Sequence, residues 1–179
     1  MPAADRTAPH VELIRSFANT IDVDDDTDVL TTRRELTRWL HEQRLLARRT
    51  PSSEEDLRLA RQLRKGIREA MAAHHGDDRV ESADLSAATK QLPLRMDCCR
   101  DVPNLEPVDN GVRGALEGIL VAVNQAVIAG DWSRMKVCPD DTCQWAFYDP
   151  TKNQSKSWCS NGCGNKAKTH SYRQRQKLG

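Results

Sequence analysis

The sequence predicts a mainly α protein, in which a helical N-terminal domain with a small β-hairpin precedes a short C-terminal module of different character. Apolar residues recur at helical spacing through most of residues 1–130. Those residues carry 18 basic and 22 acidic side chains, whereas residues 131–179 carry 9 and 4, so the formal charge of +1 divides into −4 and +5. Four of the six cysteines and six of the eight aromatic residues also follow residue 130. We therefore place a domain boundary between residues 1–130 and 131–179.

The first helix is expected over Val11–Thr20, where apolar side chains recur on one face. The acidic segment Asp22–Asp28 follows, and it lacks the glycine and the glutamate of a calcium-binding EF-hand loop, so we interpret it as a solvated loop. Thr31 or Thr32 is placed to cap the next helix, with Glu35 as the capping-box partner of Thr32. The residues that this second helix and its C-terminal extension would bury are Leu36, Trp39, Leu40 and Leu46.

A longer helix begins after Pro51–Asp56, which combines a helix breaker, a cap and acids in the first turn. Its core-facing residues are expected to be Leu57, Leu59, Ala60, Leu63, Ile67, Ala70 and Met71. The helix should end near Gly76. There we expect His74 and His75 to interact with the terminal carbonyls and the helix dipole rather than with a metal. A short helix is expected over Glu81–Gln91.

A β-hairpin and an apolar helix complete the N-terminal domain. Leu92–Cys98 alternates like a short strand, Asn104–Val108 is its expected partner, and the prolines confine both to edge positions. Asn110 and Gly111 then open a helix over Val112–Gly130. Its core face would comprise Leu116, Ile119, Leu120, Val123, Ala126 and Val127.

The remaining cysteines are adjacent, at Cys98 and Cys99, near the end of the first expected strand. We expect one buried and one partly exposed thiol there. The alternative is a redox sensor, which would require a thiol of lowered pKa.

Four cysteines in the C-terminal module form two close pairs. Cys138 and Cys143 are separated by four residues, Cys159 and Cys163 by three, and 15 residues lie between the pairs. Two such pairs can supply the four ligands of a tetrahedral structural zinc site. Two disulfides or four unrelated thiols are the alternatives, and a cytosolic setting disfavours disulfides. A catalytic zinc ion is disfavoured because no coordination position is left open. We predict one structural Zn²⁺.

The segment between the pairs is expected to form a hairpin over Gln144–Trp158, with Trp145 and Phe147 on one face and the turn at Asp149–Asn153. Its aromatic side chains are expected to pack around the metal rather than stack on bases. Ser160 would then cap a helix that runs to about residue 177. Knuckle, hairpin and helix together make a treble-clef-like zinc finger.

This last helix is strongly basic. Lys166, His170, Arg173 and Lys177 recur on one face, and no acidic residue follows Asp149. Such a helix attracts phosphates by releasing counterions and can lie in a groove of double-stranded DNA. The alternative is a solvated tail. Because one finger with so few cations should bind DNA weakly, we expect a homodimer that presents two fingers.

The C-terminal module resembles the CGNR zinc finger of bacteria. The resemblance lies in Cys163-Gly164-Asn165-Lys166, preceded by Trp158-Cys159-Ser160 and by Trp145-x-Phe147-Tyr148-Asp149. Upstream, Phe17-Ala18-Asn19-Thr20 and Trp39-Leu40 are similar to the ABATE domain usually found before that finger. The combined resemblance covers nearly the whole chain. It implies a stress-induced transcription regulator with a DNA-binding finger and an N-terminal domain that senses a stress or a small-molecule ligand whose identity is unknown.

The motif also implies site residues. The metal ligands fall on Cys138, Cys143, Cys159 and Cys163, and the motif's glycine and asparagine fall on Gly164 and Asn165. This chain departs from the pattern at Lys166, where arginine is usual, and at Lys156-Ser157, where an arginine pair is usual. Lysine is a point charge rather than a planar fork, so phosphate attraction should survive while bidentate guanine recognition is not expected. The expected DNA contacts are Lys152, Lys156, Asn165, Lys166, Lys168, His170, Arg173, Arg175 and Lys177.

Other classes of function are less consistent with the sequence. The longest purely apolar run, Ile119–Val123, is far shorter than the roughly 20 residues of a membrane span, and the first residues lack the apolar stretch of a secretory signal. We therefore expect a cytoplasmic protein that does not contact a membrane. No paired nucleophile and base is evident, so an enzyme is not expected. The alternative to DNA binding is a protein-interaction adaptor that uses the finger to bind a partner protein.

Overall fold

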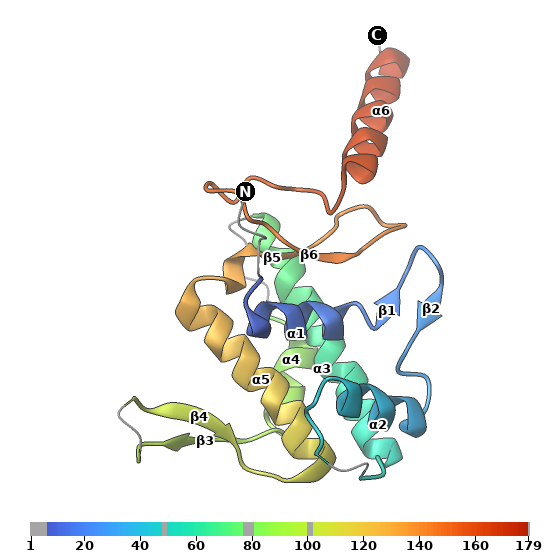
Figure 1. Ribbon diagram of the computed structural model, residues 1–179. Helices are drawn as coiled ribbons and strands as arrows, with labels where there is room; N and C mark the ends of the chain where they lie inside the picture. The colour runs from blue at the N-terminus through green and yellow to red at the C-terminus, as the bar shows by residue number, and fades with distance from the viewer. Residues whose placement is uncertain (1–6, 48–49, 77–80, 100–101, 179) are drawn as a thin grey trace, which may run out of the picture.

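The computed structural model describes residues 7–47, 50–76, 81–99 and 102–178 (Figure 1). In chain order its elements are α1 (Pro9–Ala18), β1 (Ile21–Asp22), β2 (Thr27–Asp28), α2 (Arg33–Glu42), α3 (Glu54–Ala72), η1 (Ala73–His75), α4 (Ala83–Thr89), β3 (Leu94–Asp97), β4 (Asn104–Pro107), α5 (Gly111–Ala129), η2 (Trp132–Arg134), β5 (Met135–Val137), β6 (Ala146–Tyr148) and α6 (Asn161–Leu178). Among the described residues the strands form three separate antiparallel pairs. The predicted mainly α class is confirmed.

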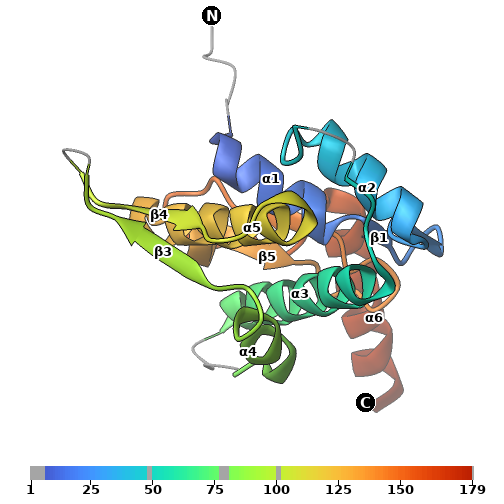
Figure 2. The same ribbon diagram turned by 90° about the horizontal axis from the view of Figure 1, so that it is seen from below.

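The core lies where α1, α3 and α5 pack together, with α2 and α4 flanking α3 (Figure 2). The largest fully buried side chains include Ile14, Phe17, Leu40, Leu63, Ile67, Leu116 and Ile119. The rings of Phe17 and Trp39 lie 5.4 Å apart and join α1 to α2. Each such side chain contributes about 1.5–3 kcal/mol when it leaves water, so this cluster is the main source of stability.

Local capping sets the helix starts, and the sequence predicts it for α2 and α3. Ser53 and Asp56 form a reciprocal capping box at α3, and Ser82 accepts from the Leu85 N–H at α4. Thr32 caps α2 by accepting from the Glu35 N–H. The Glu35 carboxylate, however, pairs with Arg38 rather than with the cap, because an ion pair one turn along the helix is within reach.

The acidic segment is only partly the solvated loop that the sequence predicts. Asp24, Asp25 and Asp26 are exposed, but Asp28 accepts two hydrogen bonds of 2.7 Å from the buried guanidinium of Arg64 in α3. The short β1–β2 hairpin carries Asp28 to that position. The prediction is therefore wrong at Asp28, because a buried arginine needs a carboxylate partner.

Helix α5 departs from the predicted core face at its end. Val127 is 54% exposed although Ala126 beside it is fully buried, so the buried face of the last turn is narrower than predicted. Glu117 is fully buried, and its carboxylate accepts from the N–H groups of Val108 and Asp109, which orders the entry to the helix. Among the described helices, α5 alone is long and apolar enough to cross a bilayer. Its packing against α1 and α3 accounts for that apolar composition.

The β3–β4 hairpin projects from the helical body (Figures 1 and 2). Leu94 pairs with Pro107 and Asp97 with Asn104, so both strands are edges, as predicted. Cys98 and Cys99 are both exposed, and the prediction of one buried thiol is wrong. In the described structure no second layer covers this end of the hairpin, which leaves both thiols open to solvent.

Candidate metal centre

The first cysteine pair lies in the loop that joins β5 to β6. Met135 pairs with Tyr148 and Val137 with Ala146 in this two-stranded sheet. Cys138 and Cys143 therefore lie near the two ends of the loop that joins its strands. The predicted hairpin within Gln144–Trp158 is wrong, since the partner of β6 lies upstream of Cys138.

The physical reason is found just after β6, at Asp149. Its carboxylate accepts from the N–H and the hydroxyl of Thr151 and from the N–H of Lys156. These bonds close the segment into a loop, so that it does not return as a strand.

A buried ion pair fixes that loop to the sheet. The Lys136 ammonium donates to the Asp149 carboxylate at 2.9 Å and to the carbonyls of Gln154 and Lys156 at 2.6 and 3.1 Å. The side chains of Lys136 and Asp149 are 5% and 0% exposed. All three donors of the ammonium are therefore used, which offsets the cost of burying it. The pair holds the segment that leads to the second cysteine pair.

The second cysteine pair lies at the start of α6. The Ser160 hydroxyl accepts from the Cys163 N–H at 3.4 Å, in agreement with the predicted cap. Gly164 packs against the Trp158 ring, and a Cβ there would lie 3.4 Å from Cδ1 of that ring. The small residue thus lets the helix approach the tryptophan that precedes Cys159.

The four sulfur atoms fit a single tetrahedral metal ion. All four lie within 4.8 Å of one another, with 3.5 Å between the Cys143 and Cys159 sulfurs and 3.7 Å between those of Cys159 and Cys163. Zinc–sulfur bonds of about 2.3 Å imply sulfur–sulfur edges of about 3.8 Å, whereas a disulfide requires about 2.05 Å. The four cysteines thus form the site of one structural Zn²⁺.

Burial of this cluster also bears on its protonation. Burial and the neighbouring cysteines raise the pKa of the Cys159 thiol, and burial raises that of Cys143. Burial opposes ionisation of Cys163 as well, but hydrogen bonds from Ser160 and the other cysteines outweigh it and lower the pKa of that thiol. Because zinc binds thiolates, its binding must displace these protons.

Two of the aromatic residues pack with the cysteines of the metal site, as predicted. Phe147 is 5% exposed and forms a small cluster with the cysteines, to which Trp158 adds a partly buried ring. Trp145 is half-buried and lies outside that cluster among the described residues.

The finger is joined closely to the helical body. Met135, Val137 and Ala146 belong to the main core. The polar side chains that bind the backbone or side chains of residues 131–148 from the helical body are His10, Asn19, Arg68, His74 and His75. The sequence predicts that His74 and His75 bind the terminal carbonyls of their own helix, and this prediction is wrong. They donate instead to the carbonyls of Met135 and Val137 in β5. Packing of η1 against β5 brings these carbonyls within reach.

The predicted DNA-contacting residues occupy two places. Helix α6 projects from the body (Figure 1), and Asn165, Lys166, Lys168 and Arg173 are exposed on it. The side chains of His170, Arg175 and Lys177 lie outside the described residues. Lys152 is exposed in the loop after β6, whereas the Lys156 ammonium lies 5.1 Å from the centre of the Phe147 ring.

Two grooves flank the base of α6. Asn165 and Lys168 face a groove of about 420 Å³ beside Lys156 and Trp158. Asn165 also lines the other groove, with Lys166 and Arg173. Lys166 is partly engaged, since its ammonium lies 3.7 Å from the Asp140 carboxylate.

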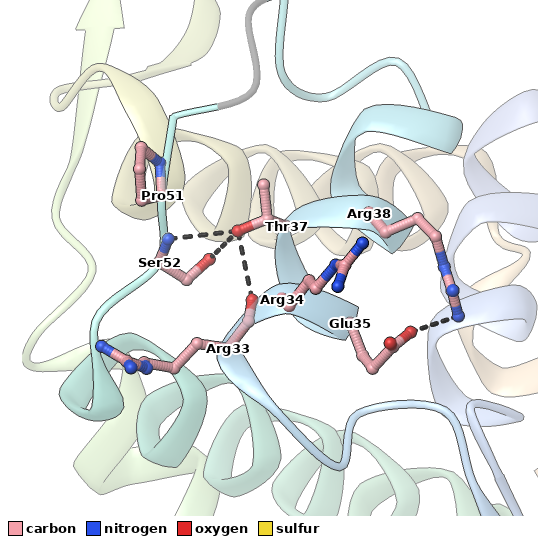
Figure 3. Close-up of a pocket in the computed structure, with 7 residues that line it drawn as sticks. All are labelled: Arg33, Arg34, Glu35, Thr37, Arg38, Pro51 and Ser52. Carbon is pink, nitrogen blue, oxygen red and sulfur yellow. Dashed lines mark hydrogen bonds and ion pairs between the residues drawn. The ribbon is translucent and has the colours of Figure 1, made fainter.

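A cavity of about 730 Å³ lies far from the cysteines, between α2 and the segment that leads to α3 (Figure 3). Its polar groups have partners close by: Arg33 pairs with Glu54, Arg38 pairs with Glu35, and the Thr37 hydroxyl binds Ser52. Arg34 also lines it. Most of the polar side chains in this wall are therefore already paired within the protein.

Comparison with known families agrees with this architecture. Residues 134–176 match the family model of the CGNR zinc finger, and residues 12–135 match that of ABATE, described as "Putative stress-induced transcription regulator". Neither is an enzyme family. No curated protein matches the sequence significantly. Because the larger match spans more than half of the chain, the protein belongs to the ABATE family and carries a CGNR zinc finger after that domain.

Proposed function

We propose that this protein is a cytoplasmic bacterial transcription regulator that binds double-stranded DNA through α6 and the adjoining part of the zinc finger. One observation carries the proposal: α6 projects from the body and has no acidic residue, while Lys166, Lys168 and Arg173 are exposed along it (Figure 1). The membership of the ABATE family supports a regulatory role.

The electrostatics favour the phosphate backbone. Cations on an exposed helix displace the counterions of DNA, and each phosphate contact adds about 0.9 to the slope of log affinity against log salt. The main body is net acidic, so it should be repelled from DNA and leave α6 as the face of approach.

Recognition of a particular DNA sequence would depend on contacts with the bases rather than with the phosphates. Lys166 is a point charge in place of a planar fork, and Asn165 beside it can pair bidentately with adenine. A single helix with few cations gives weak binding, so we propose that two copies act together as a homodimer. In this scheme the N-terminal domain receives the signal.

The test is fluorescence anisotropy with a labelled duplex between about 50 and 200 mM salt. Lys166→Ala/Arg173→Ala should weaken binding and reduce the salt slope by about 2. The matched control is Arg58→Ala/Lys90→Ala, which removes two exposed cations from the N-terminal domain and should leave the slope unchanged.

Two outcomes would overturn the proposal. The first is absence of binding to any duplex at the lowest salt. The second is equal loss in both double variants, since that would mean a diffuse charge effect. A partner captured in a pull-down that survives nuclease treatment, together with absent DNA binding, would favour the protein-interaction adaptor.

A further inference from the structure

A cavity of about 450 Å³ lies where the helical body meets the finger. One face of α3 supplies most of its wall, since residues three or four apart on a helix share a face. The lining residues are Ile21, Arg61, Arg64, Lys65, Arg68, Glu69, Ala72, Val137 and Gln144. Val137 directly precedes Cys138 and Gln144 directly follows Cys143, so the cavity reaches both ends of the loop Cys138–Cys143, which we call the knuckle.

Two of the four cations in this wall are neutralised. Arg64 has the bidentate pair with Asp28 described above. The Lys65 ammonium lies 2.5 Å from the Asp84 carboxylate and 3.6 Å from that of Glu69. Glu69 is the one acid in the wall among the described residues, and it also accepts from the Ser82 hydroxyl.

The other two cations have no carboxylate partner within ion-pair distance in the described part of the chain. Arg61 donates to the carbonyls of Leu30 and Thr31, at 2.8 and 3.0 Å. Arg68 donates to the carbonyls of Ala18 and Gln144, each at 2.8 Å. Each guanidinium thus uses two of its five N–H donors in these bonds. The cavity wall thus holds two guanidinium groups without a direct carboxylate contact in the described structure, although Asp28 acts on Arg61 and Asp22 acts on Arg68 from a distance.

Of these two arginines, Arg68 is the one whose positive charge is disfavoured by its surroundings. It is half-buried, and burial together with the positive charge of Arg64 lowers its pKa, while Asp22 opposes the effect from a distance. A partly desolvated charge beside a like charge is stabilised when an anion enters. Among the described residues, no carboxylate lies within ion-pair distance of Arg68, and Asp22 acts on it only from farther away.

Apart from Gln144, the rest of the wall is apolar. Ile21, Ala72 and Val137 line the cavity beside the alkyl parts of the arginines. A space of this size lies within the range of small-molecule sites, which combine apolar walls with a few fixed polar groups. The lining therefore suits a ligand with one charged end and an apolar body.

We propose that this cavity binds a small organic anion, whose carboxylate or phosphate group contacts Arg61 and Arg68 and whose apolar body packs against Ile21, Ala72 and Val137. The guanidinium forks match either oxyanion, since both accept bidentate hydrogen bonds.

A bound anion would affect the finger through Arg68. That side chain holds the carbonyl of Gln144, a residue with the left-handed backbone angle φ of 49°. An anion that competes for Arg68 weakens this restraint on the knuckle, and thereby on the base of α6. This regulatory consequence rests on the proposed DNA binding, whereas the anion site itself does not.

The first test is titration of the full zinc-loaded protein, without DNA, followed by amide chemical shifts. Benzoate and phenyl phosphate are the probes, so that a carboxylate and a phosphate with the same apolar body are compared. We expect saturable shifts at Ala72, Val137 and Gln144 with at least one probe. Absence of shifts with both at millimolar concentration overturns the proposal, as do shifts confined to α6.

Variants locate the site. Arg61→Gln should weaken the preferred probe about tenfold, through loss of a charge-assisted hydrogen bond. Ala72→Leu changes no charge and should weaken binding, because the larger side chain, one helical turn from Arg68, takes up space beside that guanidinium. Arg58→Gln is the matched control, because Arg58 is exposed on the same helix and pairs with Glu55 outside the cavity. Unaltered affinity in both test variants, with native zinc content and melting temperature, overturns the proposal.

The second test adds DNA. The preferred probe should change the anisotropy midpoint of the native protein and of Arg58→Gln, and should change that of Ala72→Leu less. Saturable probe binding without any DNA binding would refute the proposed function and leave the anion site standing. Normal DNA binding without probe binding would refute the anion site alone.

Discussion

The side-chain amide of Asn19 pairs with both backbone groups of Ala146, donating to its carbonyl at 2.9 Å and accepting from its N–H at 2.8 Å. Asn19 directly follows α1 and Ala146 begins β6, so the amide acts as a substitute for a neighbouring strand. It satisfies one edge of a two-stranded sheet that would otherwise present open backbone groups. These two hydrogen bonds join the finger to the helical body and fix the orientation of β6 relative to the end of α1.

Replacement of Asn19 tests this tie. Asn19→Ala should lower the free energy of unfolding by about 1–3 kcal/mol, because the partly buried N–H and carbonyl of Ala146 lose their partner. Urea denaturation measures the change, with Asn153→Ala, at an exposed loop position, as the control. Zinc content should stay the same, since Asn19 does not contact the cysteines. Equal stability of the two variants would contradict the assigned role.

Acid should remove the contribution of the Asp149 carboxylate to the free energy of unfolding. Burial opposes its ionisation, but hydrogen bonds from Thr151 and Lys136 outweigh burial and lower its pKa from 3.8 to about 2. A lowered folded-state pKa stabilises the protein above the unfolded value, so this stabilisation is complete above about pH 4 and is lost as pH falls towards 2.

The difference in unfolding free energy between the native protein and Asp149→Asn should therefore shrink by about 2 kcal/mol over that interval. Release of zinc by acid affects both proteins, and the difference between their urea midpoints separates it from Asp149. A difference that does not change with pH would show that this carboxyl does not titrate in the stated range.

Replacement of two helical glycines by alanine should change the stability of the protein in opposite directions. A Cβ at Gly66 in α3 would lie 2.3 Å from the backbone nitrogen of Leu85 in α4, so Gly66→Ala should destabilise by about 1–3 kcal/mol through overpacking. A Cβ at Gly118 in α5 would meet Leu45 at an ordinary 3.5 Å, so Gly118→Ala should stabilise by about 0.5–1 kcal/mol. Melting temperatures of both variants check the pair of predictions. A stabilised Gly66→Ala protein would refute the close approach of α3 and α4.

The cysteines should separate by reactivity. With zinc bound, iodoacetamide should modify Cys98 and Cys99, which are exposed, and spare the four metal ligands. After removal of zinc by a chelator, all six cysteines should react. Mass spectrometry counts the additions and elemental analysis counts the metal, for which one zinc per chain is expected. Six additions to the zinc-loaded protein would contradict the site.

Much of the fold could be predicted because it is decided locally. The capping box at Ser53, the apolar stripes of α1 and α3 and the break at Gly130 are patterns within a few residues. The metal site is local in the same sense, since each cysteine pair lies in one tight turn and metal chemistry restricts which four side chains can share an ion.

The wrong predictions concern partners that are distant along the chain. The sequence predicts a partner for β6 within Gln144–Trp158, whereas the structure pairs it with β5, and the hydrogen bonds of Asp149 close the downstream segment into a loop. The carbonyls that bind His74 and His75 are 61 and 62 residues away, and Arg64 meets Asp28 across 36 residues.

The sequence by itself thus determined the helical class, the starts of the capped helices and the four zinc ligands. The tertiary structure alone decided how the finger is joined to the body, which arginines have carboxylate partners and where a cavity between the two parts lies. The reason is physical: spacing along the chain encodes contacts within a turn or a helix face. Contacts between elements depend on how all the buried surfaces pack at once.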